Sequence, residues 1–191
     1  MNKLPMTFVA IVAALLAGCV SQQKYDESQS NLNNEQQKNA ELEREYQELN
    51  QAMSAEVGAK NMQISRLQHA IKVSINSELL FPSGGSEMPA AAKQSIAKIA
   101  KILAPHQTNH VNVNGYTDTT PIGPGLAKQG ITTNVILSQK RADNVMQYMI
   151  SQGVNPNMVS SHGLGEVDPV ASNDTVQGRA QNRRVELTLT N

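Results

Sequence analysis

The amino-acid composition of the chain changes near residue 72, and this change divides the chain into two parts with different secondary structure. Residues 21–70 are rich in Gln, Asn, Glu and Lys, contain no proline and hold one glycine, Gly58. Beyond residue 72, short β-branched runs alternate with helical stretches that proline and glycine delimit. The first pattern favours one long helix to about Ala70, with Gly58 as its weak point, and the second favours a packed α/β domain. We therefore predict a helical segment over residues 19–71 and a domain over residues 72–191.

The N-terminal residues have the pattern of an export signal that ends in a cysteine. Lys3 supplies a positive charge, and the apolar run over residues 6–16 is too short to span a bilayer as a permanent helix. The sequence Leu-Ala-Gly-Cys at 16–19 resembles the lipobox of bacterial lipoproteins. The resemblance implies a signal peptide over residues 1–18 and acylation of Cys19, with palmitate among the expected acyl chains. The alternative is an ordinary buried cysteine near a cleavable signal.

The residues after Cys19 bear on the membrane that would hold the lipid. Val20 and Ser21 do not match the inner-membrane retention signal of lipoproteins, an Asp directly after the cysteine. The resemblance therefore implies an outer-membrane lipoprotein that faces the periplasm. Because each buried methylene contributes about 0.8 kcal/mol, two or three acyl chains would anchor the protein without a transmembrane helix.

Charge and chemistry exclude several classes of function. Removal of residues 1–18 takes away Lys3 and no acidic residue, so the formal charge falls from zero to −1, which does not favour nucleic acid. Cys19 is the one cysteine, and no serine has a nucleophile-elbow motif. We predict no enzyme activity, no metal, no organic cofactor and no nucleic-acid partner. The histidines also lack metal-ligand spacing: His69, His106, His110 and His162.

The helical segment carries an interrupted heptad pattern. Asn39 and Lys60 fall on the main seam, where polar residues reduce stability but fix register. A self-associating coiled coil and a solvated spacer helix therefore fit the pattern equally well, and residues 22–71 could join copies of the chain or an envelope-complex protein. At 1.5 Å per residue, about 50 residues would span roughly 75 Å. The seam and its companion positions are Tyr25, Leu32, Leu42, Tyr46, Leu49, Met53 and Leu67.

The remainder predicts an α/β fold of the α+β sandwich type, in the order β-α-β-α-β-β, with two helices packed on a mixed sheet. Its first helix begins near Pro89 and ends before Pro105, and its second ends at Gly153. Alternating apolar residues mark the last strand from Val185 to Leu189. The predicted strands cover residues 73–81, 110–116, 159–164 and 185–190.

Four motifs in this domain carry a family resemblance. They are Leu-Phe at 80–81, Asn-Gly-Tyr-Thr-Asp at 114–118, the segment 134–142 with Asn134, Leu137 and Arg141, and the Gly-Arg-Ala-Gln-Asn-Arg-Arg-Val-Glu run at 178–186. In this order they resemble the OmpA-like peptidoglycan-binding domain over residues 72–191. The resemblance implies noncovalent binding of the cell-wall stem peptide, chiefly of its diaminopimelate residue.

The chemistry of diaminopimelate suits two of these residues. Its short side chain presents ammonium and carboxylate groups, so a receptor needs an anion and a cation at a fixed separation. Asp118 can accept from the ammonium, and the planar fork of Arg141 can hold a carboxylate, which lysine does less well. The resemblance gives both residues this role. The alternative is a surface ion pair between them, worth about 0–1 kcal/mol.

The resemblance assigns supporting roles to neighbouring residues. Asn134 and Leu137 would shape the groove, and Thr117 and Thr119 would add hydrogen bonds. The segment 119–133 separates the motif aspartate from the motif asparagine by more residues than the commonest form of the family, and is more similar to the flagellar stator branch. It could gate the groove, contact a partner or only connect. Three arginines are predicted to anchor loops, with the alternative that one of them reaches the glycan or the peptide: Arg179, Arg183 and Arg184.

The prediction for the whole chain is an outer-membrane lipoprotein that tethers the envelope to peptidoglycan. The alternative is a coiled-coil scaffold lipoprotein of a motor, secretion or envelope complex, in which wall binding only localises the protein.

Overall fold

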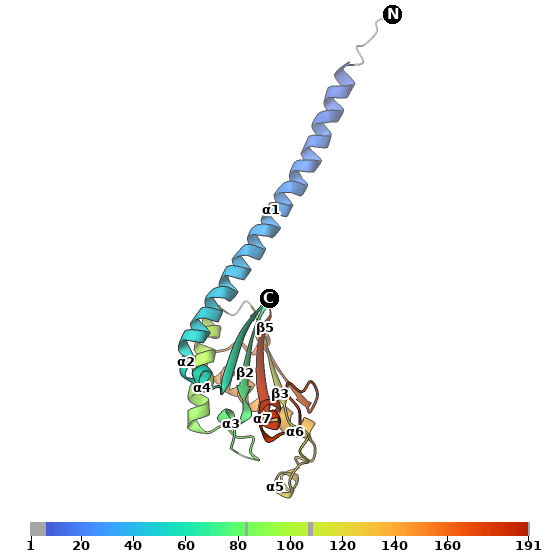
Figure 1. Ribbon diagram of the computed structural model, residues 1–191. Coiled ribbons are helices and arrows are strands. Elements are labelled where there is room, and N and C mark those ends of the chain that lie inside the picture. The colour runs from blue at the N-terminus through green and yellow to red at the C-terminus, as the bar shows by residue number, and fades with distance from the viewer. Residues whose placement is uncertain (1–6, 83, 107–108, 191) are drawn as a thin grey trace, which may run out of the picture. The chain divides into compact units, whose positions relative to one another are not determined.

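Figure 1 shows the computed structural model, which describes residues 7–82, 84–106 and 109–190. The chain forms two compact units, Met1–Glu41 and Leu42–Asn191. The described residues of the first unit belong to helix α1 (Thr7–Ala52). The predicted signal peptide over residues 1–18 and the lipid site at Cys19 lie outside the residues whose side chains are described. Across the described ranges, no helix combines the length and apolar character needed to cross a membrane.

The second unit is built on a five-stranded mixed sheet with the order β1-β2-β5-β3-β4 (Figure 1). Strands β3 and β4 run parallel, and the other neighbouring pairs are antiparallel. This arrangement confirms the predicted α/β fold with a mixed sheet. The strands are β1 (Met62–Leu67), β2 (Ala70–Asn76), β3 (His110–Tyr116), β4 (Val159–Gly165) and β5 (Arg184–Thr190).

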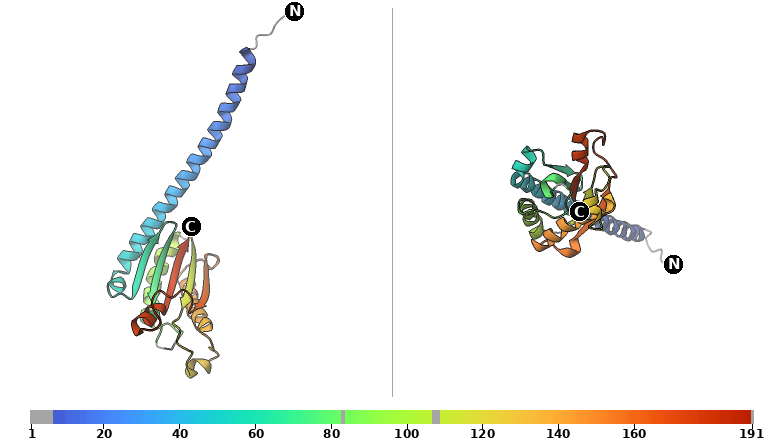
Figure 2. Two further views of the ribbon diagram at one scale, coloured as in Figure 1. Left: turned by 45° about the vertical axis from the view of Figure 1, so that its right-hand side comes forward. Right: turned by 90° about the horizontal axis from the view of Figure 1, so that it is seen from below.

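Two long helices, α4 (Ala90–Leu103) and α6 (Asn134–Ser151), cover one face of the sheet (Figure 2). Pro89 is the N-cap residue of α4, as its position in the sequence predicts. Ile96 and Ile99 are fully buried on the inner side of this helix. The shorter helices are α2 (Ser54–Gly58), α3 (Ser77–Leu80), α5 (Pro124–Ala127), α7 (Val176–Asn182) and two 3-10 turns, η1 (Ala104–His106) and η2 (Pro156–Met158).

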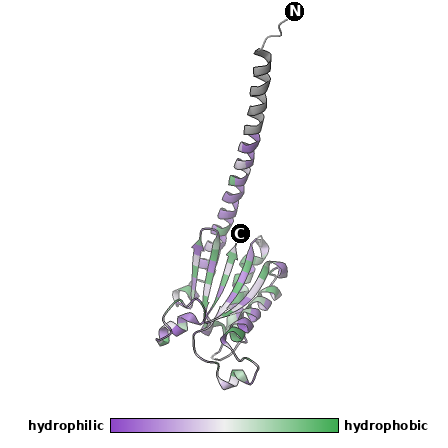
Figure 3. Cartoon of the chain, turned by 90° about the vertical axis from the view of Figure 1, so that its right-hand side faces the viewer, coloured by the Kyte–Doolittle hydropathy of each residue, from purple (hydrophilic) through white to green (hydrophobic). Residues whose placement is uncertain are grey.

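The strands alternate between apolar and polar residues, so the sheet has one buried and one polar face (Figure 3). In β2, Ile71, Val73 and Ile75 are fully buried, while the residues between them are partly exposed. Side chains that follow one another in a strand point to opposite faces. The apolar face therefore packs on α4 and α6, and the polar face points away from them.

The predicted helix to about Ala70 is wrong, because α1 ends at Ala52 and residues 62–67 form β1. The short β1 alternates the buried Met62 and Ile64 with the polar Gln63 and Ser65, which is a strand pattern within a polar segment. It pairs with β2 in an antiparallel hairpin, and Met62 lies opposite Ile75. The predicted division between residues 71 and 72 falls inside β2.

The last turns of α1 belong to the core of the second unit. Leu42, Leu49 and Met53 are fully buried among the strand and helix residues. These residues were predicted for the seam between helices, whereas Tyr25 and Leu32 of the first unit are 59% and 50% exposed. The buried leucines therefore stabilise the α/β unit and do not form an exposed coiled-coil seam.

Truncation of these leucines is expected to destabilise the α/β unit. Leu42→Ala and Leu49→Ala should each lower the free energy of unfolding by about 2–5 kcal/mol, because each removes a fully buried side chain and leaves a cavity. Leu32→Ala is the matched control, since Leu32 is half exposed in the same helix. Denaturant unfolding measures all three. Equal stability of the three variants would contradict the packing described above.

The predicted strand to Phe81 is also corrected, because residues 77–80 form α3. The side chain of Asn76 accepts a hydrogen bond from the Glu78 N–H at 2.9 Å and caps this helix. The Ser77 N–H donates to the Arg183 carbonyl at 2.9 Å, which ties α3 to the start of β5. Leu80 and Phe81 are buried, so the apolar character of these residues reflects core packing in a helical turn.

Candidate functional site

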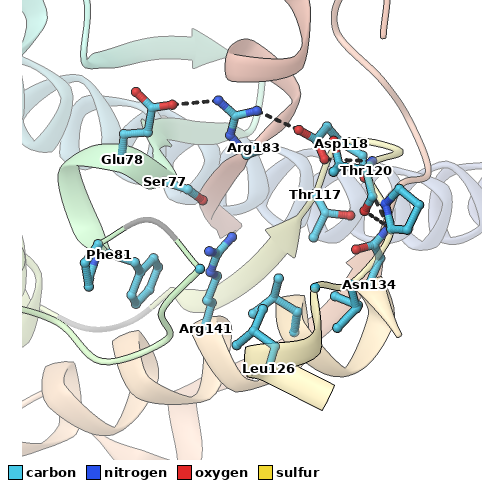
Figure 4. A pocket seen from close by; sticks show the side chains of 16 residues that line it. Ser77, Glu78, Phe81, Thr117, Asp118, Thr120, Leu126, Asn134, Arg141 and Arg183 are labelled. Atoms are coloured by element: carbon cyan, nitrogen blue, oxygen red, sulfur yellow. Dashed lines mark hydrogen bonds and ion pairs between the residues drawn. The ribbon is translucent and has the colours of Figure 1, made fainter. Parts of the chain in front are cut away.

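A groove of about 630 Å³, here named the strand-end groove, lies where β3 ends and β5 begins (Figure 4). Its walls come from α3 and the following turn, the end of β3, the segment 119–133, the first turns of α6, and Arg183. Among the predicted site residues, the groove brings together Thr117, Asp118, Asn134, Leu137 and Arg141.

Asp118 lies at the end of β3 with both carboxylate oxygens engaged. Oδ1 accepts from the Thr120 N–H at 2.9 Å, which closes a turn that aims the carboxylate. Oδ2 accepts from Nη1 of Arg183 at 2.6 Å. Asp118 is only 5% exposed, and it forms no ion pair with Arg141 among the described contacts. The alternative of a surface ion pair between these two residues is therefore not what the structure contains.

Arg183 is the residue for which the sequence prediction was incomplete. It was expected to anchor a loop, but its guanidinium lines the groove between two carboxylates (Figure 4). Nη1 donates to Asp118, and Nη2 donates to Oε1 of Glu78 at 2.6 Å. Arg183 follows Asp118 by 65 residues in the sequence, so local spacing gave no sign of this contact.

The other two arginines hold loops, as predicted. Nη1 of Arg179 donates to the Asn173 carbonyl at 2.8 Å. Nη2 of Arg184 donates to the Asp168 carbonyl at 3.0 Å, and Nε of Arg184 donates to Glu186 at 2.8 Å.

The environment of Asp118 keeps its carboxyl ionised. Burial alone would raise the pKa of Asp118, but hydrogen bonds from Arg183 and Thr120 and the charge of Arg183 outweigh it. The resulting pKa lies below the ordinary value of 3.8. For Arg183, burial would lower the pKa, but the hydrogen bonds and charges of Glu78 and Asp118 raise it. Both groups are therefore charged at neutral pH.

The lowered pKa of Asp118 makes a part of the folding stability dependent on pH. A group whose pKa is lower in the folded state stabilises the fold above its unfolded pKa, and this contribution is lost as pH falls through the folded pKa. We expect Asp118→Asn to reduce the free energy of unfolding by a constant amount between pH 5 and pH 7, and the difference to decrease progressively as the pH falls below about 4 and through the lowered pKa of Asp118. Urea unfolding of both proteins across this range measures it. A difference that is independent of pH would contradict the assignment.

Arg141 enters the groove from α6 and keeps part of its guanidinium free. Nε donates to the Gly85 carbonyl at 3.0 Å, and the guanidinium carbon lies 5.3 Å from the centre of the Phe81 ring. These contacts fix the plane of the fork and leave its two terminal nitrogens without a hydrogen-bond partner among the described residues. The fork can therefore take a carboxylate with two parallel hydrogen bonds.

The free charge of Arg141 is costly in the absence of an anion. The pKa of Arg141 is lowered to about 10, chiefly by burial and also by the charge of Arg183, while the charge of Asp118 acts in the opposite direction. An anion bound at the fork would relieve this cost. The groove thus presents the Arg141 guanidinium at one side, without a bound anion, and the Asp118 carboxylate at the other. This arrangement suits a ligand that has both an ammonium and a carboxylate.

Asn134 connects the segments around Asp118. Its side-chain amide donates to the carbonyls of Asp118 and Thr120 at 3.3 and 3.2 Å, and to Glu166 at 3.3 Å. This side chain therefore fixes the turn that carries the carboxylate. Thr119 is exposed and is not among the described lining residues, so its predicted hydrogen bond to a ligand has no support in this geometry.

The segment 119–133 is more than a connection, because it supplies one wall of the groove. Residues 124–127 form helix α5, and Ile131 is 1% exposed beneath this segment. The lining residues are Thr120, Pro121, Ile122, Gly123 and Leu126, most of them apolar. Together with Leu137 and Phe81 they give the charged groove an apolar side.

Two glycines bring α6 close enough to the sheet to place Arg141. A Cβ on Gly163 would lie 2.3 Å from the Gln139 nitrogen, and a Cβ on Gly115 would lie 2.3 Å from the Ser138 carbonyl oxygen. The Gly165 N–H donates to the Ser138 hydroxyl at 2.9 Å and binds the helix to β4. The Gly-Leu-Gly sequence at 163–165 therefore lies in strand β4, where it allows α6 to pack closely on the sheet.

Several lining residues were not predicted as site residues: Ser77, Glu78, Phe81, Pro82, Gly84 and Arg183. Ser77, Glu78 and Phe81 belong to α3 and its C-cap, which the sequence placed in a strand, and Pro82 and Gly84 lie in the turn that follows. The part of the chain that the structure describes holds no cluster of three or more side chains suited to a metal ion.

Comparison with known proteins places these motifs in one family. The sequence profile of the OmpA family matches residues 80–183. The probable lipoprotein YiaD of Escherichia coli K12 is 36% identical over 126 residues, which make up 66% of this chain and 54% of YiaD. The peptidoglycan-binding protein ArfA of Mycobacterium tuberculosis H37Rv is 36% identical over 123 residues, or 64% of this chain and 35% of ArfA. The chain thus spans about half of YiaD and about a third of ArfA.

Solved structures have the same fold. The cell wall anchor of the T6SS from Pseudomonas aeruginosa superimposes with a TM-score of 0.67 at 26% identity, covering 74% of this chain and 96% of that one. The periplasmic domain of Helicobacter pylori MotB gives a TM-score of 0.61 at 31% identity, covering 68% of this chain and 81% of that one.

Proposed function

This chain belongs to the OmpA family, and from this membership and the geometry of the groove we propose that it binds peptidoglycan noncovalently through the diaminopimelate of the stem peptide. The observation that carries the proposal is the free fork of Arg141 across one groove from the carboxylate of Asp118. Two relatives have names that support it, the peptidoglycan-binding protein ArfA and the cell wall anchor of the T6SS.

In the proposed complex each charged group has a defined partner. The ammonium of diaminopimelate hydrogen bonds to Asp118, whose carboxylate keeps lone pairs beyond those that Arg183 and Thr120 use. A ligand carboxylate takes the terminal nitrogens of Arg141. Glu78 holds the guanidinium of Arg183 in place. Arg183 therefore stays near the ligand and continues to compensate the charge of Asp118. Binding requires no bond making or breaking, and the proposed role is therefore non-enzymatic.

The proposed cellular role adds a lipid anchor to this domain. Lipidation at Cys19 would place the protein in the outer membrane facing the periplasm, and α1 would separate lipid from the wall-binding unit. YiaD, a relative named as a probable lipoprotein, supports this part of the proposal. The protein would then tether the membrane to the wall.

Sedimentation with purified sacculi tests the proposed function. The full chain in mild detergent should pellet with sacculi that contain diaminopimelate. It should remain in the supernatant when no sacculi are added. Binding should persist when the salt concentration is raised moderately, because partly buried ion pairs are screened less than exposed ones. A folded chain that stays in the supernatant at low salt would refute the proposal.

A further inference from the structure

A second groove of about 600 Å³, here named the sheet-face groove, lies on the polar face of β1, β2 and β5 and extends to α7. Its lining is mostly polar, in contrast to the helix-covered face of the sheet. The strand-end groove does not account for it, and the motif run at 178–186 supplies part of its lining. The lining residues used below are Lys60, Gln63, Lys72, Ser74, Asn76 and Arg184.

The strand register brings these side chains together on one face. Ser74 lies opposite Gln63 in β1 and opposite Glu186 in β5, and Asn76 lies opposite Arg184. Directly opposed residues in an antiparallel pair point to the same face of a sheet. The result is a band of amide, hydroxyl and charged groups across three strands, with hydrogen-bonding capacity for a polar ligand.

The charges in this band favour an anionic ligand. Glu186 is already compensated, because its Oε1 accepts from Arg184 at 2.8 Å and lies 3.7 Å from Nζ of Lys72. The guanidinium of Arg184 also lies 3.8 Å from the centre of the Tyr116 ring, so it is held in the floor of the groove. Lys60 is exposed and has no ion pair within the described ranges. The two lysines therefore leave an excess of positive charge.

Consecutive residues line the two grooves in two places. Ser77 lines the strand-end groove and Asn76 lines the sheet-face groove. In the same way, Arg183 lines the first groove and Arg184 lines the second. Consecutive Cα atoms are about 3.8 Å apart, so at these two positions the linings of the two grooves follow each other directly along the chain.

We infer that the sheet-face groove binds an acidic stretch of the same stem peptide whose diaminopimelate fills the strand-end groove. This inference rests on the proposed function. The peptide beyond the diamino acid carries further carboxylates and amides, which match the lysines and the amide side chains of the band. The groove would thus select a diamino acid within a wall peptide over the free amino acid.

The test compares two double variants of the full chain in mild detergent. Lys60→Gln/Lys72→Gln removes two charges from the sheet-face groove. Lys93→Gln/Lys101→Gln removes two charges from α4, on the other side of the sheet, and is the matched control. The probes are free meso-diaminopimelate, a synthetic stem tripeptide that ends in diaminopimelate, and sacculi. Calorimetry, sedimentation and thermal unfolding follow affinity and folding.

The groove variant should bind the tripeptide roughly threefold to tenfold more weakly than the control, because each partly exposed ion pair contributes modestly. Its affinity for free diaminopimelate should be unchanged. Equal tripeptide affinity in both variants would overturn the inference while leaving the proposed function intact. Weaker binding to sacculi alone would indicate a glycan in the groove and would overturn the assignment to peptide. Failure of the unaltered chain to bind any probe would overturn the proposed function itself.

Discussion

Replacement of Arg141 by alanine is expected to abolish sedimentation with sacculi while the chain stays folded. Arg141 is 6% exposed, and the terminal nitrogens of its fork have no hydrogen-bond partner among the residues that the structure describes. Removing one partner of a buried, hydrogen-bonded charge pair typically costs about 2–5 kcal/mol, which corresponds to a loss of affinity of roughly 30-fold or more. Binding isotherms with sacculi measure the change, and thermal unfolding verifies the fold.

Two further variants, one at the neighbouring residue and one at Arg141 itself, separate the effect of charge from that of geometry. Lys140→Ala removes the neighbouring exposed cation of α6 and should leave binding nearly unchanged. Arg141→Lys keeps the charge but loses the planar fork and the Nε bond to Gly85, so it should bind more weakly than the unaltered chain. Equal affinity of Arg141→Ala and the unaltered chain would show that the ligand does not use this guanidinium.

Gly163→Ala is expected to destabilise the α/β unit and to impair binding together. The new Cβ would lie 2.3 Å from the Gln139 nitrogen and 2.5 Å from its Cα, and both atoms belong to the backbone of α6. The helix must therefore move away from β4, and Arg141 moves with it. Overpacking of this kind typically costs about 1–3 kcal/mol in unfolding free energy. Denaturant unfolding and sacculus binding measure the two effects.

Gly125→Ala is the matched control for this prediction, because a Cβ there meets no atom within 4 Å. It lies in α5, so its effect on stability should be small. If Gly163→Ala were as stable as Gly125→Ala, the close approach of α6 to the sheet would be contradicted.

The sequence predicts those parts of the fold in which pattern and packing agree. Strand β5 alternates apolar and polar residues, and α4 begins after Pro89 and presents one apolar side, so both follow from periodicity. Strand β1 could not be predicted in this way, because it continues a polar segment and depends on pairing with β2. The turns of α1 that carry Leu42 and Leu49 were misassigned for a related reason, since a buried helix face and a coiled-coil seam share similar spacing.

The candidate site was predictable where a motif names a residue, and less so where distant segments meet. Asp118 and Arg141 follow from motif position, and both line the groove. The ion pairs of Arg183 with Asp118 and Glu78 join residues that are 65 and 105 positions apart, so only the folded chain reveals them. The wall formed by Ile122 and Leu126 likewise depends on the path of an extended segment.

The central claim, that the strand-end groove holds diaminopimelate, is tested most directly by competition. The full chain is bound to sacculi, free meso-diaminopimelate is added, and the released protein is measured, with lysine as the control because it has a single carboxylate. The account predicts release by diaminopimelate at concentrations at which lysine has no effect, and no specific binding for Asp118→Ala. Retention of the unaltered protein at saturating diaminopimelate, or equal release by lysine, would contradict it.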